Sequence, residues 1–143
     1  MMAFTPDIDL LTAVMDRILP SAGDIPGAGS MGLAQEVIDR SQTDDRFWSA
    51  LEMILTALPA AKEFSRLSDS ARDEVLTSVE ALYLDAFGFW VDVIYAIYYM
   101  QPQVHARLGW HGRPPQPDGN QMPPWDEAVL ANIRTRESFW KQV

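Results

Sequence analysis

The apolar residues of this chain recur mostly at helical spacing. Near the N-terminus, apolar side chains three or four positions apart would share one face of a helix. They are Ile8, Leu11, Met15, Ile18 and Leu19. Thr5 is placed to cap this helix and Pro6 to begin it. Pro20 ends it, because proline lacks the backbone N–H that a helix needs, so the pattern predicts a first helix that stops before residue 20.

Further amphipathic segments follow a loop at residues 20–30, which holds two Pro and three Gly. Ser30 is placed to begin a second, short helix that ends near residues 40–42. Thr43 begins a third helix, which Pro59 ends or kinks. We find no internal repeats and no segment with the strict alternation of a half-buried strand.

A fourth amphipathic helix begins at Ser68 or Ser70, and an aromatic segment follows it. Residues 83–100 place apolar side chains in nearly every direction around a helix, which is typical of a helix at the centre of a domain. We therefore expect the aromatic stripe of this helix to belong to the core rather than to a cofactor pocket. The stripe consists of Tyr83, Phe87, Trp90 and Ile94.

The C-terminal part of the chain has a different composition. Residues 109–125 are rich in proline and are bracketed by Trp110 and Trp125. Fixed φ angles and missing donors predict an extended arm with little regular structure. A last helix is predicted at residues 126–137. The sequence as a whole predicts an all-α fold: a single-domain bundle of five or six helices over residues 1–143, built around the central aromatic-rich helix.

Charge and composition exclude several classes of partner. Eleven Lys and Arg against twenty Asp and Glu give a net charge of −9, and the pI is near 4.5, so the chain repels nucleic acid and anionic lipid. The most apolar segment, residues 86–100, is broken by Asp92 and is shorter than the ~20 residues of a spanning helix, so we expect no membrane insertion. The absence of cysteine excludes disulfides, thiolate nucleophiles and a covalently attached c-type haem.

Candidate catalytic groups are few. His105 and His111 are the only histidines, and neither stands in a metal-ligand spacing such as E-x-x-H. Asp85 and Asp92 are seven residues apart and lie roughly on one face of the aromatic helix. One hypothesis is therefore a small stand-alone helical enzyme that acts on a carbohydrate through His105 or His111 together with Asp85 or Asp92. We favour the interpretation that Asp85 and Asp92 face solvent or cap buried donors and take no part in catalysis. We also expect the chain to bind no metal, haem or flavin.

The proline-rich arm offers a different kind of site. An extended strip with a tryptophan at each end contributes little to helix packing, yet it exposes large apolar rings as protein-binding surfaces do. The predicted partner-binding residues are Trp110, His111, Arg113, Pro114, Pro115, Pro117 and Trp125. An arm folded back on its own domain is the alternative, and the residues favour neither.

Several short motifs follow one another in a definite order along most of the chain. They are LTAVMDRILP at residues 11–20, Pro26-Gly27-Ala28, Gly32 at the opening of the second helix, Leu108-Gly109-Trp110-His111-Gly112, and Pro114-Pro115-Gln116-Pro117. In order and spacing they resemble the small-subunit family typified by subunit 3 of gluconate 2-dehydrogenase. A glycine-tyrosine-proline-glycine stretch of that family reads Gly109-Trp110-His111-Gly112 here, so the local contact with a partner is expected to differ.

The resemblance implies a non-catalytic subunit in a hetero-oligomer with a large FAD-dependent dehydrogenase of the glucose–methanol–choline type. Such dehydrogenases oxidise sugars, glycosides, sugar acids or polyols, and the FAD belongs to the partner. Family members often carry a twin-arginine signal that is missing here, so we expect a cytoplasmic protein as written, or a periplasmic one if the chain is processed or co-exported. A helical regulatory module that binds an unrelated protein is a further alternative.

Overall fold

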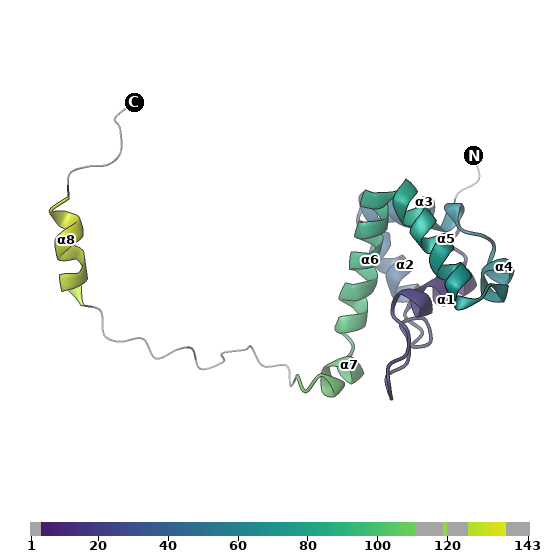
Figure 1. Ribbon diagram of the computed structural model, residues 1–143, viewed down its shortest axis with the longest axis horizontal. Helices are drawn as coiled ribbons and strands as arrows, with labels where there is room; N and C mark the ends of the chain where they lie inside the picture. Colours follow the sequence, from purple (N-terminus) through teal and green to yellow (C-terminus); the bar gives the residue numbers. More distant parts are fainter. Residues whose placement is uncertain (1–3, 111–118, 120–125, 137–143) are drawn as a thin grey trace, which may run out of the picture. The chain divides into compact units, whose positions relative to one another are not determined.

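The computed structural model describes residues 4–110, 119 and 126–136, and these residues form helices joined by loops (Figure 1). In the first of two compact units, Met1–Gly112, the helices are α1 (Ile8–Ile18), α2 (Ala34–Ser41), α3 (Asp45–Ala57), α4 (Ala61–Arg66), α5 (Asp69–Leu82), α6 (Leu84–Tyr99) and α7 (Pro102–Arg107). In the second, Arg113–Val143, they are the 3-10 helix η1 (Glu127–Leu130) and α8 (Ala131–Arg134).

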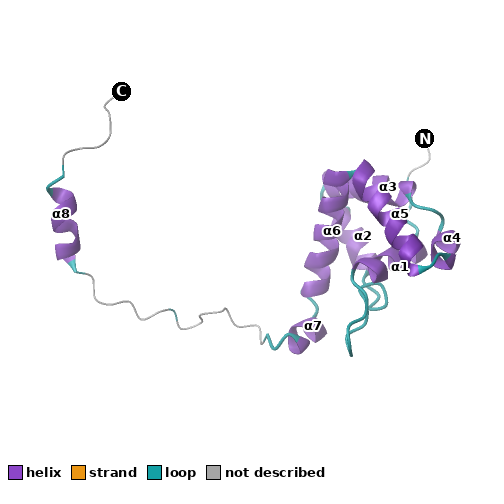
Figure 2. Ribbon diagram, in the orientation of Figure 1, coloured by secondary structure: helices purple, strands orange, loops and turns teal. Residues whose placement is uncertain are grey.

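The prediction of an all-α fold is confirmed. Figure 2 shows no strand in the described part of the chain, where the only β-type pairing is a single bridge between Ala22 and Ile25. The helices α4 and α7, each six residues long, add to the longer helices that the apolar spacing predicts. A single domain over residues 1–143 stays a prediction.

Side-chain caps set where the helices begin. Asp7 caps α1 by accepting from the backbone N–H groups of Asp9 and Leu10 at 3.0 and 3.1 Å, so this helix begins later than Thr5 predicts. Ser68 caps α5 by accepting from the N–H of Ala71 at 3.3 Å, and this contact selects Ser68 over Ser70 as the cap.

The second helix also begins later than predicted. It starts at Ala34, because Ser30 has another role. The Ser30 hydroxyl donates to Asp16 of α1 at 2.7 Å, and its backbone N–H donates to the same carboxylate at 2.8 Å. Ser30 therefore fastens the loop after α1 onto that helix rather than opening α2.

The loop can approach α1 this closely only because it carries glycine. A Cβ atom at Gly29 would lie 2.0 Å from the Thr12 carbonyl oxygen, and one at Gly27 would lie 2.4 Å from an Asp16 carboxylate oxygen. Between the two glycines, Ala28 is fully buried, and its N–H donates to the Leu19 carbonyl at 2.9 Å. Glycine at these two positions therefore allows residues 27–30 to pack against α1.

The core of the first unit is formed by one face of each long helix. Its largest fully buried apolar side chains are Trp90, Phe64, Leu11, Met15, Leu51, Ile54 and Ile94. The prediction that Trp90 and Ile94 are core residues is confirmed, whereas Tyr83 and Phe87 are half-buried at its edge. The indole N–H of Trp90 is buried with no hydrogen-bond partner among the described residues.

An ion pair joins the first helix to the fifth. The Arg17 guanidinium donates to both carboxylate oxygens of Asp73, through Nε at 2.5 Å and through Nη2. These hydrogen bonds hold the pKa of Asp73 below its usual value of 3.8. Arg72, also on α5, donates to the carbonyls of Phe64 and Ser65 at 3.1 and 2.7 Å. It therefore provides hydrogen-bond donors for backbone carbonyls at the C-terminal end of α4.

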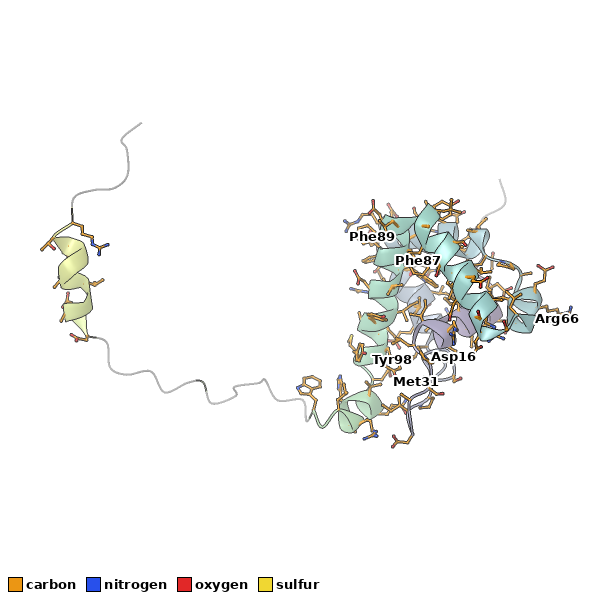
Figure 3. All side chains as sticks on the ribbon, viewed as in Figure 1. Asp16, Met31, Arg66, Phe87, Phe89 and Tyr98 are labelled. Carbon is orange, nitrogen blue, oxygen red and sulfur yellow. The ribbon has the colours of Figure 1, made fainter. Side chains whose placement is uncertain are left out.

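The helix α6 contacts α2, α3, α5 and α7, so it occupies a central position among the helices of the first unit. Phe87 and Phe89 lie at one end of it and Tyr98 lies at the other (Figure 3). Only one side of α6 is covered by these neighbours, and the other side is exposed. No helix among the described residues is long and apolar enough to cross a membrane.

The short helices of the second unit are held by local contacts. Asp126 caps η1 by accepting from the N–H of Ala128 at 2.9 Å. Arg134 in α8 forms an ion pair with Glu127 in η1 at 2.8 Å. The helix predicted at residues 126–137 is therefore present as a 3-10 turn followed by a short α-helix.

Candidate functional site

Of the residues predicted to bind a partner, the structure describes Trp110. The others lie outside the described residues: His111, Arg113, Pro114, Pro115, Pro117 and Trp125. The Trp110 side chain is 47% exposed at the end of the first unit, just beyond α7. This described end of the predicted arm is therefore the starting point of the candidate site.

Trp110 is held against α7 and, through it, against the end of α6. Its backbone N–H donates to the His105 carbonyl at 2.9 Å, and its ring meets the His105 ring edge-on, with the centroids 4.2 Å apart. The Nε2 atom of His105 lies 2.5 Å from the Tyr99 carbonyl oxygen, so this nitrogen carries a proton and donates it. These contacts fix Trp110 beside the last turn of α6.

Trp110 belongs to a larger group of exposed apolar side chains, which we name the aromatic surface. Its members are Phe89, Tyr95, Tyr99 and Met100 from the α6 region and Leu108 and Trp110 from the α7 region. Each is between 41% and 69% exposed. The rings of Tyr95 and Tyr99 meet edge-on at 6.2 Å, and the contacts of His105 connect Tyr99 with Trp110.

The aromatic surface lies along the uncovered face of α6. At 3.6 residues per turn, the exposed residues of this helix fall on one side of it. They are Leu84, Asp85, Gly88, Phe89, Asp92, Tyr95, Ala96 and Tyr99. Gly88, Asp92 and Ala96 follow one another at intervals of four residues along this face, with Phe89 in the neighbouring row on one side and Tyr95 and Tyr99 in the row on the other. Large apolar groups in such numbers on one exposed face are typical of protein-binding surfaces.

One end of the surface is supported by α3. The rings of Phe89 and Phe47 meet edge-on at 6.3 Å, and the Arg46 guanidinium lies 6.0 Å from the centroid of the Phe89 ring. Arg46 also pairs with Asp44 at 3.0 Å, and this pairing lowers the pKa of the Asp44 carboxyl. Phe89 is therefore held in position by neighbours on its own domain while much of its ring stays exposed.

The groups of the enzyme hypothesis are not joined by a hydrogen bond or ion pair in the described part of the chain. Asp85 and Asp92 share the exposed face of α6, as their spacing predicts, with a separation along the axis of roughly 10 Å. His105 is engaged with Tyr99 and Trp110, and His111 lies outside the described residues. Among residues 4–110, 119 and 126–136, no three His, Asp or Glu side chains gather as metal ligands would.

The surface of the first unit also has a polar hollow and an apolar groove. The polar hollow between α1, the following loop and α5 is lined by Asp16, Arg17, Ser30, Asp69 and Arg72, whose charges already pair with one another or with the backbone. The apolar groove beside α5 is lined by Pro59, Leu67, Val75, Val79 and Leu82, among others. The first is a structural ion-pair network, and the second lacks the aromatic anchors of the α6 face.

The sequence predicts Trp110 as a partner-binding residue, and this stays a prediction, whereas it places Phe89, Tyr95, Tyr99 and Met100 in a central helix. Tyr95, Tyr99 and Met100 lie in the aromatic segment, where apolar residues on every side do not distinguish an exposed ring from a buried one.

Comparison of the chain with protein-family models, with curated proteins and with solved structures found no match.

Proposed function

We propose that this chain is a non-catalytic small subunit that binds and stabilises a large FAD-dependent dehydrogenase of the glucose–methanol–choline type. It would assist the folding, maturation or flavin loading of that enzyme, which would act on sugars, glycosides, sugar acids or polyols. The FAD would belong to the partner. The proposal combines the motif resemblance given above with the aromatic surface.

The aromatic surface is the observation that carries the protein-binding part of this proposal. Six large apolar side chains are exposed on adjoining parts of one domain, and Trp110 joins them to the start of the predicted arm. Tryptophan and tyrosine are frequent hot spots, because a rigid ring buries much apolar area at little cost in side-chain entropy. A partner that covered this surface would remove the rings from water, which supports association.

Co-expression with a candidate flavoprotein dehydrogenase tests the function. We expect the dehydrogenase to be less soluble, to hold less FAD and to be less active when this chain is absent. Trp110→Ala should increase the Kd of the complex by an amount corresponding to about 2 kcal/mol, while the chain keeps its helix content.

Leu82→Ala is the matched control, because Leu82 is 73% exposed but lies on α5, outside the aromatic surface. It should leave the Kd unchanged. A dehydrogenase that is equally soluble, flavin-loaded and active without this chain would refute the proposed function.

A further inference from the structure

The loop that follows α1 reaches α7 and forms an ion pair with it (Figure 1). The Arg107 Nε atom lies 2.8 Å from a carboxylate oxygen of Asp24. A Cβ atom at Gly23 would lie 3.9 Å from Arg107 Nη2, so the loop also packs against the guanidinium. Arg107 is the last residue of α7 and stands three positions before Trp110. We name this ion pair of Asp24 with Arg107 the hairpin contact.

Asp24 stands at the tip of a tight turn that is anchored on α1. Ala22 and Ile25 exchange backbone hydrogen bonds at 3.0 and 3.1 Å, so Gly23 and Asp24 form a two-residue tip. Gly23 has a φ of 63°, a conformation that glycine adopts without strain. Just beyond Ile25, residues 27–30 pack against α1 through the close approach of their glycines and the hydrogen bonds of Ser30. The turn therefore presents the Asp24 carboxylate to α7 from a fixed support.

The helix α7 depends on contacts with other elements for its position. It is six residues long, which is too short for a stable helix by itself. Val104 is its buried residue, and His105 donates to the end of α6. Among the described residues, α7 takes part in no ion pair other than that of Arg107. The hairpin contact is thus a third anchor, at the end of α7 from which Trp110 follows.

Trp110 moves with this end of α7. Its backbone N–H donates to the His105 carbonyl, and its ring packs against the His105 ring. The hairpin contact is exposed, with 59% of the Arg107 side chain and 78% of the Asp24 side chain accessible to solvent. An exposed ion pair contributes little to global stability and is screened by salt. It can still set how often a weakly held helix end opens, because local opening has a much smaller free energy than global unfolding.

We infer that Asp24 is a positioning residue for Trp110. Through Arg107 it holds the end of α7 in place, and so keeps the Trp110 ring in a fixed orientation on the aromatic surface. Salt weakens this restraint. The use of Trp110 in binding a partner rests on the proposed function, whereas the restraint on α7 rests on the hairpin contact itself.

Amide hydrogen exchange of the full chain, without a partner, tests the restraint. The reporters are the backbone N–H groups of Leu108, Gly109 and Trp110, which donate to carbonyls of α7 at 3.0, 3.2 and 2.9 Å. Asp24→Asn removes the charge and keeps a residue that suits the turn. The three N–H groups should then exchange about two- to fivefold faster, as expected from the loss of an exposed ion pair.

Two further measurements separate the ion pair from a general effect of the substitution. Asp24→Arg combined with Arg107→Asp reverses the pair and should restore slow exchange. In about 1 M NaCl, where the Debye length is about 3 Å, the difference between the original chain and Asp24→Asn should shrink.

Glu80→Gln is the matched control. It also removes one negative charge, at an exposed position of α5 that takes part in none of the ion pairs of the described residues. It should leave the exchange of the three N–H groups unchanged. If Asp24→Asn also leaves it unchanged, or if the reversed pair does not restore slow exchange, the inference is refuted and the proposed function stands.

The second arm measures the Kd of the full chain for the flavoprotein dehydrogenase. Asp24→Asn should raise the Kd about two- to fivefold, and the reversed pair should restore it. In the Trp110→Ala chain, Asp24→Asn should have no further effect, because the hairpin contact acts through that ring. Faster exchange in Asp24→Asn with an unchanged Kd would show that Asp24 does not position Trp110 for binding. If the dehydrogenase does not bind the original chain, the proposed function is refuted, and the exchange measurements decide the restraint on α7 by themselves.

Discussion

The same substitution, glycine to alanine, is expected to have opposite effects at two positions of this protein. At Gly29 the new Cβ would lie 2.0 Å from the Thr12 carbonyl oxygen, whereas ordinary contact begins at 3.4 Å. The loop must therefore move away from α1 by about 1.4 Å. At Gly88 the new Cβ meets nothing within 4 Å.

The magnitude for Gly29→Ala follows from what such a movement breaks. Ser30 donates to Asp16 at 2.8 and 2.7 Å, and a displacement of that size removes both hydrogen bonds. A hydrogen bond to a charged group contributes about 1.5–3 kcal/mol. Because Ser30 is exposed, each of its two hydrogen bonds to Asp16 should contribute about 1.5 kcal/mol or less. We expect Gly29→Ala to lower the free energy of unfolding by about 2–3 kcal/mol. Gly88→Ala should raise it by about 0.5–1 kcal/mol.

Urea unfolding followed by circular dichroism measures both values. The slope of the free energy against urea should stay the same, so the midpoint alone should move, downward for Gly29→Ala and upward for Gly88→Ala. In a domain of this size each kcal/mol also shifts the Tm by roughly 4 °C. If Gly29→Ala leaves the midpoint unchanged or raises it, the close packing of the loop on α1 is wrong, and if Gly88→Ala lowers the midpoint, the open space at Gly88 is wrong.

Three further predictions follow from the core, the ion pairs and the composition. Trp90→Ala should lower the free energy of unfolding by about 3–5 kcal/mol, and Trp90→Phe by much less, because phenylalanine keeps most of the ring and removes the unpaired indole N–H; urea unfolding measures both. Asp73→Asn should destabilise the chain at pH 7, because the lowered pKa of Asp73 contributes stability above pH 3.8. That contribution disappears as the pH falls through the lowered pKa, so the two unfolding curves should converge in acid; a constant difference would exclude the ion pair with Arg17. The purified chain should show no visible absorption band from flavin or haem and no stoichiometric metal by elemental analysis, and a stoichiometric chromophore would overturn that prediction.

The helical class of this fold could be predicted from the sequence because apolar spacing and proline positions are local signals. Pro20 and Pro59 lie just beyond the ends of α1 and α3, as the missing proline N–H predicts. The residue that caps each helix was harder to predict from the sequence, since Thr5, Asp7 and Ser30 are all good capping residues. Ser30 instead donates to Asp16 in the preceding helix, 14 residues earlier in the chain, and no local sequence pattern reveals this contact.

The exposed face of α6 in the candidate site could not be predicted from the sequence pattern. An aromatic helix has the same sequence pattern whether it is buried on all sides or keeps one face for another protein. The exposed half of α6 becomes visible only when α2, α3, α5 and α7 are placed on its other side. The open space at Gly88 likewise depends on what lies around it in three dimensions. Trp110 was predicted because a tryptophan beside a proline-rich segment is a local signal.

Hydroxyl-radical footprinting of the chain, alone and in complex with the flavoprotein dehydrogenase, tests the central claim most directly. Met100 and Met53 provide a matched pair of exposed methionines, one on the aromatic surface and one on α3. The account predicts that complex formation protects Met100 from oxidation, together with Tyr95, Tyr99 and Trp110, and leaves Met53 unchanged. Protection of Met53 with undiminished oxidation of Met100 would show that the partner binds elsewhere and would contradict the account.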